Sequence, residues 1–367
     1  MKQQIRFVPK DKSKFFATLR SRIDNYFTDN NLSKHANSEM VVKSIVLLGG
    51  YIFTFAFMLF LGINGWSGYL LWALMGVFCA GIGMSVMHDA NHGAYSKKQE
   101  VNDWIGYSLN LVGGAVTNWK LQHNILHHTY TNVPTHDDDI QNRAILRFNP
   151  QGKSNLIHKF QFVYAFFFYG ILTLYWVTLK DLVQLIKFKK DGVSKATDKE
   201  LFVLFLKMSM MKIAYFSAML LLPVYVFGFS WTFVLTGFLL LHFVTGLILT
   251  VIFQLAHSVE GTTHPMPDST GIIENDWAIH QMHTTVNFSR HNKWLSWYVG
   301  GLNFQVEHHL FPRICHVHYP ALAHIVKETA EEFGIPYLEN HTFGQALNSH
   351  IALLQRMGLP ELNEAIA

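Results

Sequence analysis

The stretch "TFVLTGFLLLHFVTGLILTVIFQLAH", Thr232–His257, decides the fold class of this chain. It contains no Asp, Glu, Lys or Arg. It is longer than the roughly 20 mostly apolar residues that a helix needs to cross a lipid bilayer. The segment also ends on a histidine, an unusual residue at the boundary between lipid and water. The sequence therefore indicates a membrane protein with a polar group at the end of a spanning helix.

The composition of the 367-residue chain agrees with lipid as a second solvent. Hydrophobic residues make up 50% and charged residues only 15%, whereas a soluble domain carries about 25% charged residues. The net charge of +4 is modest, and no basic motif with interleaved aromatics indicates nucleic acid as a partner. Cys79 and Cys315 lie far apart, which argues against a disulfide framework or a cysteine metal site.

Four stretches have the length and apolar character of spanning helices. They are Val42–Ile63, Tyr69–Met87, Ile213–Phe229 and Thr232–Ala256. The links "NGWSG" and "GFSW" are short and uncharged, so each pair predicts a tight hairpin. We expect an all-α integral membrane protein with four transmembrane helices in two hairpins, interfacial helices and a cytosolic cap rich in histidine.

Basic residues predict the orientation of these helices. Lysine and arginine are concentrated before the first span and after the second, and such residues favour the cytoplasmic side. We therefore expect a multi-pass protein of the cell membrane with both termini and the histidine clusters in the cytoplasm. The polar start does not resemble a secretory signal. We divide the chain into a polar basic segment (1–40), a membrane domain (41–337) and a helical tail (338–367), with a break at Gly334 and Pro336.

A fifth apolar stretch, Phe160–Val177, complicates this count. If it crossed the membrane, the histidine clusters before and after it would lie on opposite faces and could not share a site. We expect it to lie in the interface, with its tyrosine and tryptophan side chains at headgroup depth.

Three clusters contain many of the 21 histidines: "HDANH" (His88–His92), "HNILHH" (His123–His128) and "QVEHH" (Gln305–His309). Residues three and four apart share one face of a helix, so each cluster can direct side chains to one point. A single histidine in an apolar chain is usually an ordinary core residue, but three clusters on one membrane face predict a metal centre. His257, at the end of the last span, joins this set.

The surroundings of the clusters favour one metal over others. Zinc would supply hydrolysis or structure, since it has no redox chemistry. An apolar four-helix bundle suits a long hydrocarbon as the substrate. Attack on an unactivated C–H bond needs oxygen and a redox metal, so iron is expected. A metal transporter or membrane cytochrome remains the alternative from another class. Those proteins place ligands near mid-membrane, where His242 is the one obvious candidate.

The three clusters resemble the histidine boxes of the membrane fatty acid desaturases, and the resemblance extends from about Met84 to Tyr337. A third box that opens with glutamine, as "QVEHHLFP" does, resembles the front-end group (delta-5 and delta-6 type, linoleoyl-CoA desaturase-like). The resemblance implies two iron ions held by His88, His92, His123, His127, His128, His257, His308 and His309. It implies that Gln305 is a weak ligand or orients the site, and that Asp89 supports it. The acidic run Asp137–Asp139 is either a further support or a solvated turn.

The resemblance also implies an activity and partners. The enzyme would use O2 to insert a cis double bond into a fatty acyl chain on the carboxyl side of an existing one. A hydroxylase with the same two irons is the close alternative. The substrate would be an acyl-CoA or an acyl-lipid, in contact with membrane lipid. No HPGG haem motif occurs in the sequence, so a separate electron donor, a ferredoxin-like protein or cytochrome b5, is expected.

Overall fold

The computed structural model describes residues 5–8, 13–141 and 145–359, and most of them are helical. They form two compact units. Unit 1 comprises residues 37–121 and 166–251, and unit 2 comprises 2–36, 122–165 and 252–367. The predicted segments 1–40 and 338–367 extend beyond the described residues at 1–4, 9–12 and 360–367. Three helices have residues in both units: η2 (Lys120–His127), α8 (Gln161–Tyr175) and α12 (Trp231–His257).

Unit 1 contains the long apolar helices that are not shared between the units, and also the segment of the first histidine cluster. Its elements are α2 (Ser38–Phe60), α3 (Gly65–Gly81), η1 (Ile82–Val86), α4 (Met87–Asn91), α5 (Gln99–Gly106), α6 (Ser108–Leu111), α7 (Val116–Trp119), η4 (Trp176–Lys180), α9 (Asp181–Asp191), α10 (Asp198–Phe216), η5 (Ser217–Leu221) and α11 (Leu222–Tyr225).

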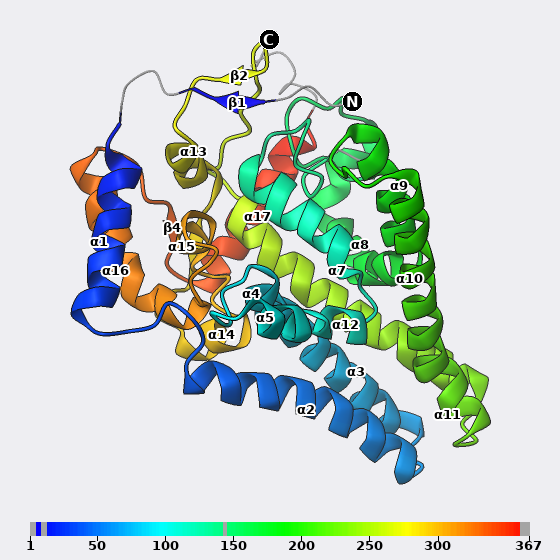
Figure 1. Cartoon of the computed structure of the whole chain (residues 1–367). Helices are drawn as coiled ribbons and strands as arrows, with labels where there is room; N and C mark the ends of the chain where they lie inside the picture. Colours follow the sequence, from blue (N-terminus) through cyan, green and yellow to red (C-terminus); the bar gives the residue numbers. More distant parts are fainter. Residues whose placement is uncertain (1–4, 9–12, 142–144, 360–367) are drawn as a thin grey trace. The chain divides into compact units, whose positions relative to one another are not determined.

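Short turns join consecutive helices of the chain, and α2 has a capped start. Asn37 begins α2 by accepting a hydrogen bond from the Met40 amide at 3.1 Å, which satisfies one of the free N–H groups of the first turn. Figure 1 shows α2 and α3 running side by side and joined by one short turn. A short turn at Gly228 likewise joins α11 to α12. Both predicted links are therefore short turns between consecutive helices, and the two-hairpin arrangement stays a prediction.

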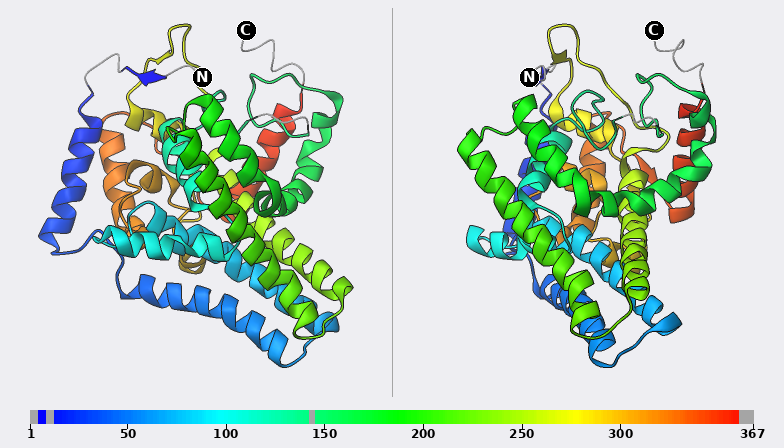
Figure 2. Two further views of the ribbon diagram at one scale, coloured as in Figure 1. Left: turned by 45° about the vertical axis from the view of Figure 1, so that its right-hand side comes forward. Right: turned by 90° about the vertical axis from the view of Figure 1, so that its right-hand side faces the viewer.

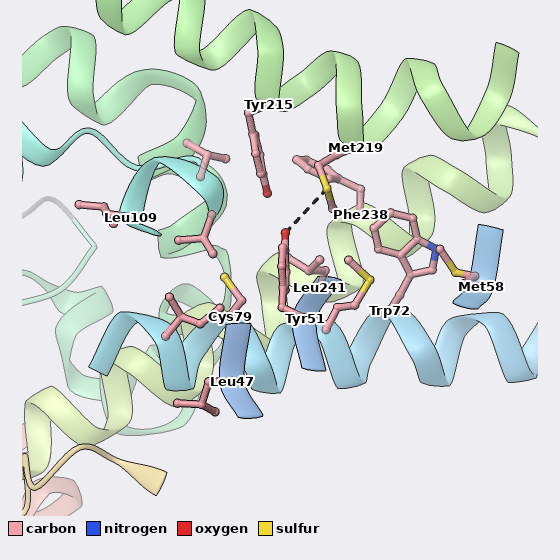
Figure 3. Close-up of a cluster of buried hydrophobic side chains, with 14 of the residues drawn as sticks. Leu47, Tyr51, Met58, Trp72, Cys79, Leu109, Tyr215, Met219, Phe238 and Leu241 are labelled. Atoms are coloured by element: carbon pink, nitrogen blue, oxygen red, sulfur yellow. Dashed lines mark hydrogen bonds between the residues drawn. The ribbon is translucent and has the colours of Figure 1, made fainter. Parts of the chain in front are cut away.

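Small residues let the apolar helices of unit 1 pack closely, as expected where lipid provides little hydrophobic drive. A Cβ on Gly76 would lie 2.7 Å from the Leu241 carbonyl of α12, and one on Gly237 would lie 2.2 Å from the Trp72 ring of α3. The core around Trp72 is apolar, with Tyr51 and Tyr215 as its polar members (Figure 3). The Tyr51 hydroxyl donates to the Met219 sulfur at 3.7 Å.

Five helical stretches of the described residues are long and apolar enough to cross a membrane. They are Ser38–Phe60, Gly65–Asn91, Leu156–Asp191, Asp198–Tyr225 and Trp231–His257. Four of them overlap the predicted spans. The first helix ends at Phe60 instead of Ile63, and the helical run that includes most of the third predicted span begins at Asp198 and ends at Tyr225 instead of Phe229. The fifth, Leu156–Asp191, contains the stretch expected in the interface. The chain is a membrane protein, and the count of four crossings stays a prediction.

Unit 2 contains shorter helices and all four strands of the described chain. Its elements are β1 (Arg6–Phe7), α1 (Phe15–Asp29), η3 (Leu156–Phe160), β2 (Ile272–Ile273), α13 (Trp277–Thr284), β3 (Asn287–Phe288), α14 (Lys293–Tyr298), α15 (Gln305–Leu310), η6 (His316–His318), α16 (Tyr319–Glu332), β4 (Glu339–Asn340) and α17 (Phe343–Met357). The strands pair in parallel, β1 with β2 and β3 with β4.

Two contacts bring distant segments of unit 2 together. In both views of Figure 2, α1 (blue) lies beside α16 (orange). Their shared core includes Phe15, Leu19 and Leu322, and Arg22 pairs with Glu332 at 2.7 Å on its edge. At the other end, the buried guanidinium of Arg147 donates to the Met357 carbonyl at 2.9 Å. A cation suits this position because the carbonyls at a helix C-terminus are free.

Substitution of Gly246 tests the close packing of α8 and α12. A Cβ there would lie 2.5 Å from the Gly170 carbonyl and 2.7 Å from that of Tyr169, and these backbone atoms cannot move aside easily. We expect Gly246→Ala to lower the free energy of unfolding by about 1–3 kcal/mol through overpacking. Gly49→Ala is the matched control, since no atom lies within 4 Å of its Cβ. Thermal unfolding in detergent measures both, and equal melting temperatures would contradict the packing argument.

Candidate metal centre

Unit 2 brings seven of the predicted site residues together. They come from η2 and the residue after it, from the last turn of α12, and from α15. All seven side chains are buried. The residues are His123, His127, His128, His257, Gln305, His308 and His309.

The second histidine cluster owes its geometry to a π-helical turn. Residues Lys120–His127 form a π-helix, whose hydrogen bonds join residues five apart instead of four. His123 and His128 therefore face one another, with their Nε2 atoms 3.3 Å apart. His127 remains close to His123, at 5.3 Å between ring centroids. The predicted shared face of His123 and His127 is confirmed. The sequence did not predict the π-helix, whose wider turn brings His128 to the same side.

His127, His257 and His309 form a compact group of three rings. The centroids of His127 and His257 are 4.7 Å apart, those of His127 and His309 4.9 Å, and those of His257 and His309 4.8 Å. One nitrogen of each ring lies within 4.8 Å of one nitrogen of the others. Such a spacing allows three imidazoles to ligate one ion, since metal–nitrogen bonds are about 2.0–2.1 Å for zinc and similar for other first-row metals.

Hydrogen bonds fix which nitrogen each of these rings presents. The Nδ1 of His127 donates to Asp137 Oδ2 at 3.0 Å. The Nδ1 of His257 donates to the Thr284 carbonyl at 3.2 Å. The Nδ1 of His309 donates to Gln281 Oε1 at 2.8 Å. Each ring thereby carries its proton on Nδ1 and keeps a lone pair on Nε2, which is how metal-binding histidines are commonly oriented.

Asp137 lies in the structure as a buried partner of His127 instead of in a solvated turn. Its side chain has 0% exposure, and its Oδ2 also accepts the Asn132 amide at 3.0 Å. Burial alone would lower the pKa of His127, but the charge and hydrogen bond of Asp137 outweigh it and raise that pKa. The Nε2 of His127 is buried and has no hydrogen-bond partner among the described residues. A cation at that nitrogen would satisfy both the lone pair and the carboxylate.

A second group of ligand atoms overlaps the first at His309. His128, His308 and His309 offer nitrogens within 4.8 Å of one another. The ring of His128 stacks on that of His309 at 4.3 Å between centroids. His308 Nδ1 lies 3.2 Å from the Tyr319 hydroxyl. Two overlapping groups that share one histidine can accommodate more than one ion, and the all-imidazole donor set suits iron, copper, nickel or zinc.

Gln305 lies inside this cluster, next to His257. Its Nε2 lies 2.8 Å from His257 Nε2. Because His257 Nδ1 holds the proton, Nε2 accepts and the glutamine amide donates. The Gln305 Oε1 is buried without a hydrogen-bond partner among the described residues. The side chain can therefore cap the His257 lone pair or turn its oxygen toward a cation.

The first histidine cluster belongs to unit 1. His88 lies in α4 and His92 directly follows it, with ring centroids 4.7 Å apart, so the two side chains share a face as predicted from their spacing. The Trp119 ring meets each of them edge-on at 5.6 Å. Asp89 Oδ1 lies 3.9 Å from His88 Nδ1. All these residues are buried. Their role as ligands and support stays a prediction.

Three polar residues that the sequence did not single out hold the cluster of unit 2 together. Gln281 Nε2 donates to the His128 carbonyl at 3.2 Å while its Oε1 accepts from His309. The Thr131 hydroxyl lies 2.8 Å from the same Oε1. Asn132 Nδ2 donates to the His257 carbonyl at 2.9 Å. Thr131 and Asn132 belong to the run "HHTYTN", whose polar residues in a buried segment were an available signal; Gln281 offered none.

Other histidines are accommodated outside the cluster. Burial lowers the pKa of His280 to about 4, so this side chain is neutral at neutral pH, and its ring packs 4.8 Å from that of Phe7. In unit 1, His242 is buried at mid-helix and its Nε2 lies 3.0 Å from the Tyr215 hydroxyl. Its Nδ1 lies 3.4 Å from the Thr173 hydroxyl, so each ring nitrogen has a partner in the core and this residue does not favour a transporter or cytochrome.

Known sequences resemble the chain over almost its whole length. Residues 64–341 match the sequence model of the family "Fatty acid desaturase". The chain is 34% identical to an sn-1 linoleoyl-lipid 6-desaturase of Arthrospira platensis over 96% of its length and 95% of the relative's. It is also 34% identical to the enzyme of that name from Synechocystis, covering 97% and 98%. An acyl-lipid (8-3)-desaturase of Physcomitrium patens is 34% identical over 98% of this chain and 75% of the relative.

The Asp137–His127 pair provides a test of the metal centre. Asp137→Asn removes the carboxylate charge but keeps the size of the side chain. We expect the affinity for Co²⁺, used as a visible probe, to fall about 10–100-fold, as for other carboxylates that orient a ligating histidine. Titration of the purified protein in detergent measures this. Asp268→Asn, in an exposed turn, is the control. Unchanged affinity in Asp137→Asn would argue against His127 as a ligand.

Proposed function

Because this chain belongs to the fatty acid desaturase family, we propose that it inserts a cis double bond into a fatty acyl chain on the carboxyl side of an existing one. Family membership makes the chain an oxidoreductase that desaturates fatty acyl substrates. The position of the new bond is supported by Gln305 at the start of the third box. It is also supported by relatives named linoleoyl-lipid 6-desaturase and Delta(5) fatty acid desaturase.

We propose that the metal is a pair of iron ions. The donor set fits: the imidazoles are buried, His127 Nε2 has no hydrogen-bond partner in the part of the chain that the structure describes, and the two groups of unit 2 overlap at His309. His88 and His92 are included on the pattern of the three boxes in the sequence. When bound, iron supplies the redox chemistry with O2 that removes hydrogen from an unactivated carbon. The eight proposed ligands are His88, His92, His123, His127, His128, His257, His308 and His309.

The residues of the chain orient the metal ligands and exclude water from the site. Asp137, Thr284 and Gln281 hold the three rings through Nδ1 and so direct each Nε2 away from that partner, which orients the rings for a cation. The burial of every residue of the cluster keeps water away, which protects reactive species from side reactions. Gln305 either donates a hydrogen bond from its amide nitrogen to His257 or directs its side-chain oxygen toward the metal. Asp89, beside His88, is proposed to support the first pair.

A two-hairpin topology is supported by the position of the second and third boxes. His127, His257 and His309 lie within one group of unit 2, so they share one face of the membrane and an even number of crossings separates them. Three candidate helices lie between His127 and His309, so at least one of them does not cross. We propose that it is Leu156–Asp191. Its 36 residues would extend about 54 Å, well beyond the roughly 30 Å of a bilayer core.

The surface of this helix supports a place in the interface. Apolar side chains are exposed along it, among them Phe160, Val163 and Phe167 near its start and Val183 and Ile186 near its end. Lysines accompany them, and Lys180 lies over the Trp176 ring at 5.2 Å. Exposed apolar residues flanked by lysine are typical of helices that lie on a membrane. We accordingly propose a cell-membrane protein with its site and termini in the cytoplasm.

Two partners complete the proposal. The acyl group is carried by a lipid or by coenzyme A; the relatives named for lipid-linked substrates support the lipid. Electrons come from a separate donor, either a ferredoxin-like protein or cytochrome b5. A hydroxylase with the same metal centre is the second candidate, but the relatives named as desaturases favour desaturation.

Product analysis tests the activity. The chain is expressed in a host with a compatible donor and supplied with mono- and di-unsaturated fatty acids. We expect a new double bond on the carboxyl side of an existing one, located by gas chromatography–mass spectrometry of derivatives that mark double bonds. His308→Ala and His309→Ala should abolish the product, because each removes a ligand. Hydroxylated products would favour the second candidate, and full turnover with full iron loading in His309→Ala would refute the ligand assignment.

Cysteine labelling tests the topology. In a chain without Cys79 and Cys315, single cysteines replace Trp66, Lys98 or Lys195, all exposed residues. With four crossings, Lys98→Cys and Lys195→Cys should react with an impermeant maleimide from the same face and Trp66→Cys from the other. If Leu156–Asp191 crosses, Lys195→Cys should react from the face opposite to Lys98→Cys. Intact cells and inverted vesicles distinguish the faces.

A further inference from the structure

The third box also contains a buried carboxylate. Glu307 lies between Gln305 and His308 in α15, and its side chain has 0% exposure. Its Oε1 accepts a hydrogen bond from the Tyr337 hydroxyl at 2.8 Å, and its Oε2 accepts one from Asn287 Nδ2 at 2.8 Å. A buried carboxylate requires such partners, because transfer of an unpaired charge from water is costly.

Asn287 connects this carboxylate to the backbone of the box. Its Oδ1 accepts the Val306 amide at 2.9 Å, and its Nδ2 also donates to the Tyr337 oxygen at 2.6 Å. The Phe288 amide, next in β3, donates to the Asn303 carbonyl at 3.0 Å. Strand β3 thus holds the chain on both sides of the start of α15. A helix of only six residues has little stability of its own, so its position depends on contacts of this kind.

Strand β4 supports β3 in turn. The Asn287 amide donates to the Leu338 carbonyl at 3.0 Å, and the Ser289 amide to the Asn340 carbonyl at 2.9 Å. Arg290 forms two hydrogen bonds with Glu339, of 2.7 and 2.6 Å. The break in the sequence at Gly334 and Pro336 makes this arrangement possible, since Gly334 has a φ of +65° that a side chain rarely adopts. The turn after α16 thereby delivers Tyr337 to Glu307.

We propose that Glu307, Asn287 and Tyr337 form a clamp that positions the third histidine box for metal binding. The proposal rests on the proposed function, because it assigns these residues to the same metal centre. They are positioning residues: Gln281 and Tyr319 contact the rings of His309 and His308, whereas the clamp sets the place of the short helix that carries both rings. The segment after Gly334 is accordingly part of the metal site through its contacts.

Single-atom changes test the clamp without large damage to the fold. Tyr337→Phe removes the hydroxyl that bonds Glu307, and Glu307→Gln removes the charge at nearly constant size. Tyr26→Phe is the matched control, since the Tyr26 ring lies in α1 and packs on Phe27. Each full-length protein is loaded with Co²⁺ in detergent, and its affinity, its visible absorption bands and its melting temperature are measured.

We expect Tyr337→Phe and Glu307→Gln to weaken Co²⁺ binding about tenfold or more and to shift the absorption bands, which report ligand geometry. Tyr26→Phe should match the unchanged protein. The double variant should bind no more weakly than the worse single variant, because the three residues act as one unit. With an active iron form, kcat should fall while the KM for the acyl substrate stays constant.

Two outcomes would overturn the clamp. Unchanged affinity and bands in both variants would exclude a role at the metal centre. A lower melting temperature with unchanged bands would show a purely structural role. These results do not depend on turnover. If the unchanged protein binds Co²⁺ but yields no desaturated product with iron and a donor, the proposed function fails while the clamp is still judged from affinity and bands.

Discussion

The organisation of unit 2 depends on one property of imidazole: its two nitrogens have to be satisfied by different partners. When one nitrogen donates to the protein, the other keeps a lone pair that points away from that partner. His127, His257 and His309 each donate through Nδ1 to a buried oxygen, from Asp137, Thr284 and Gln281 respectively. Three acceptors on two different segments therefore place three lone pairs in one small volume. Buried nitrogens without this arrangement would cost free energy and gain nothing.

This requirement explains why so much polar structure surrounds an apolar bundle. Lipid cannot satisfy polar groups, so those near the membrane must be satisfied within the protein. Unit 1 achieves this with helical backbone and a few internal pairs, such as the buried Lys212–Asp181 contact at 2.8 Å. Unit 2 instead uses side-chain amides and hydroxyls around its histidines. Thr131, Asn132 and Gln281 each bond a box residue or its direct partner.

The sequence predicted the parts of the molecule that depend on local pattern. Apolar length located the long helices, and short uncharged links located the turns between them. Spacing correctly placed His88 and His92 on one face. It did not predict the π-helical turn at Lys120–His127, because helix type there depends on tertiary contacts. The sequence also could not predict two contacts between residues far apart in the chain. Gln281 lies 28 residues from its partner His309, and Tyr337 lies 30 residues from its partner Glu307. Composition alone could not decide whether Leu156–Asp191 crosses the membrane, because apolar helices both span bilayers and lie in the interface.

The π-helical turn has a consequence for the design of metal sites on other helices. It places His128 beside His123 by fitting one additional residue into the hydrogen-bonded turn. In an α-helix, which rotates by about 100° per residue, the five residues from His123 to His128 would turn the second side chain about 140° away from the first. The run "HNILHH" transplanted into a regular α-helix would therefore keep His123 and His127 on one face and lose His128. A designed α-helix that is to present three such side chains needs spacings of three and four, as from Gln305 to His308 and His309.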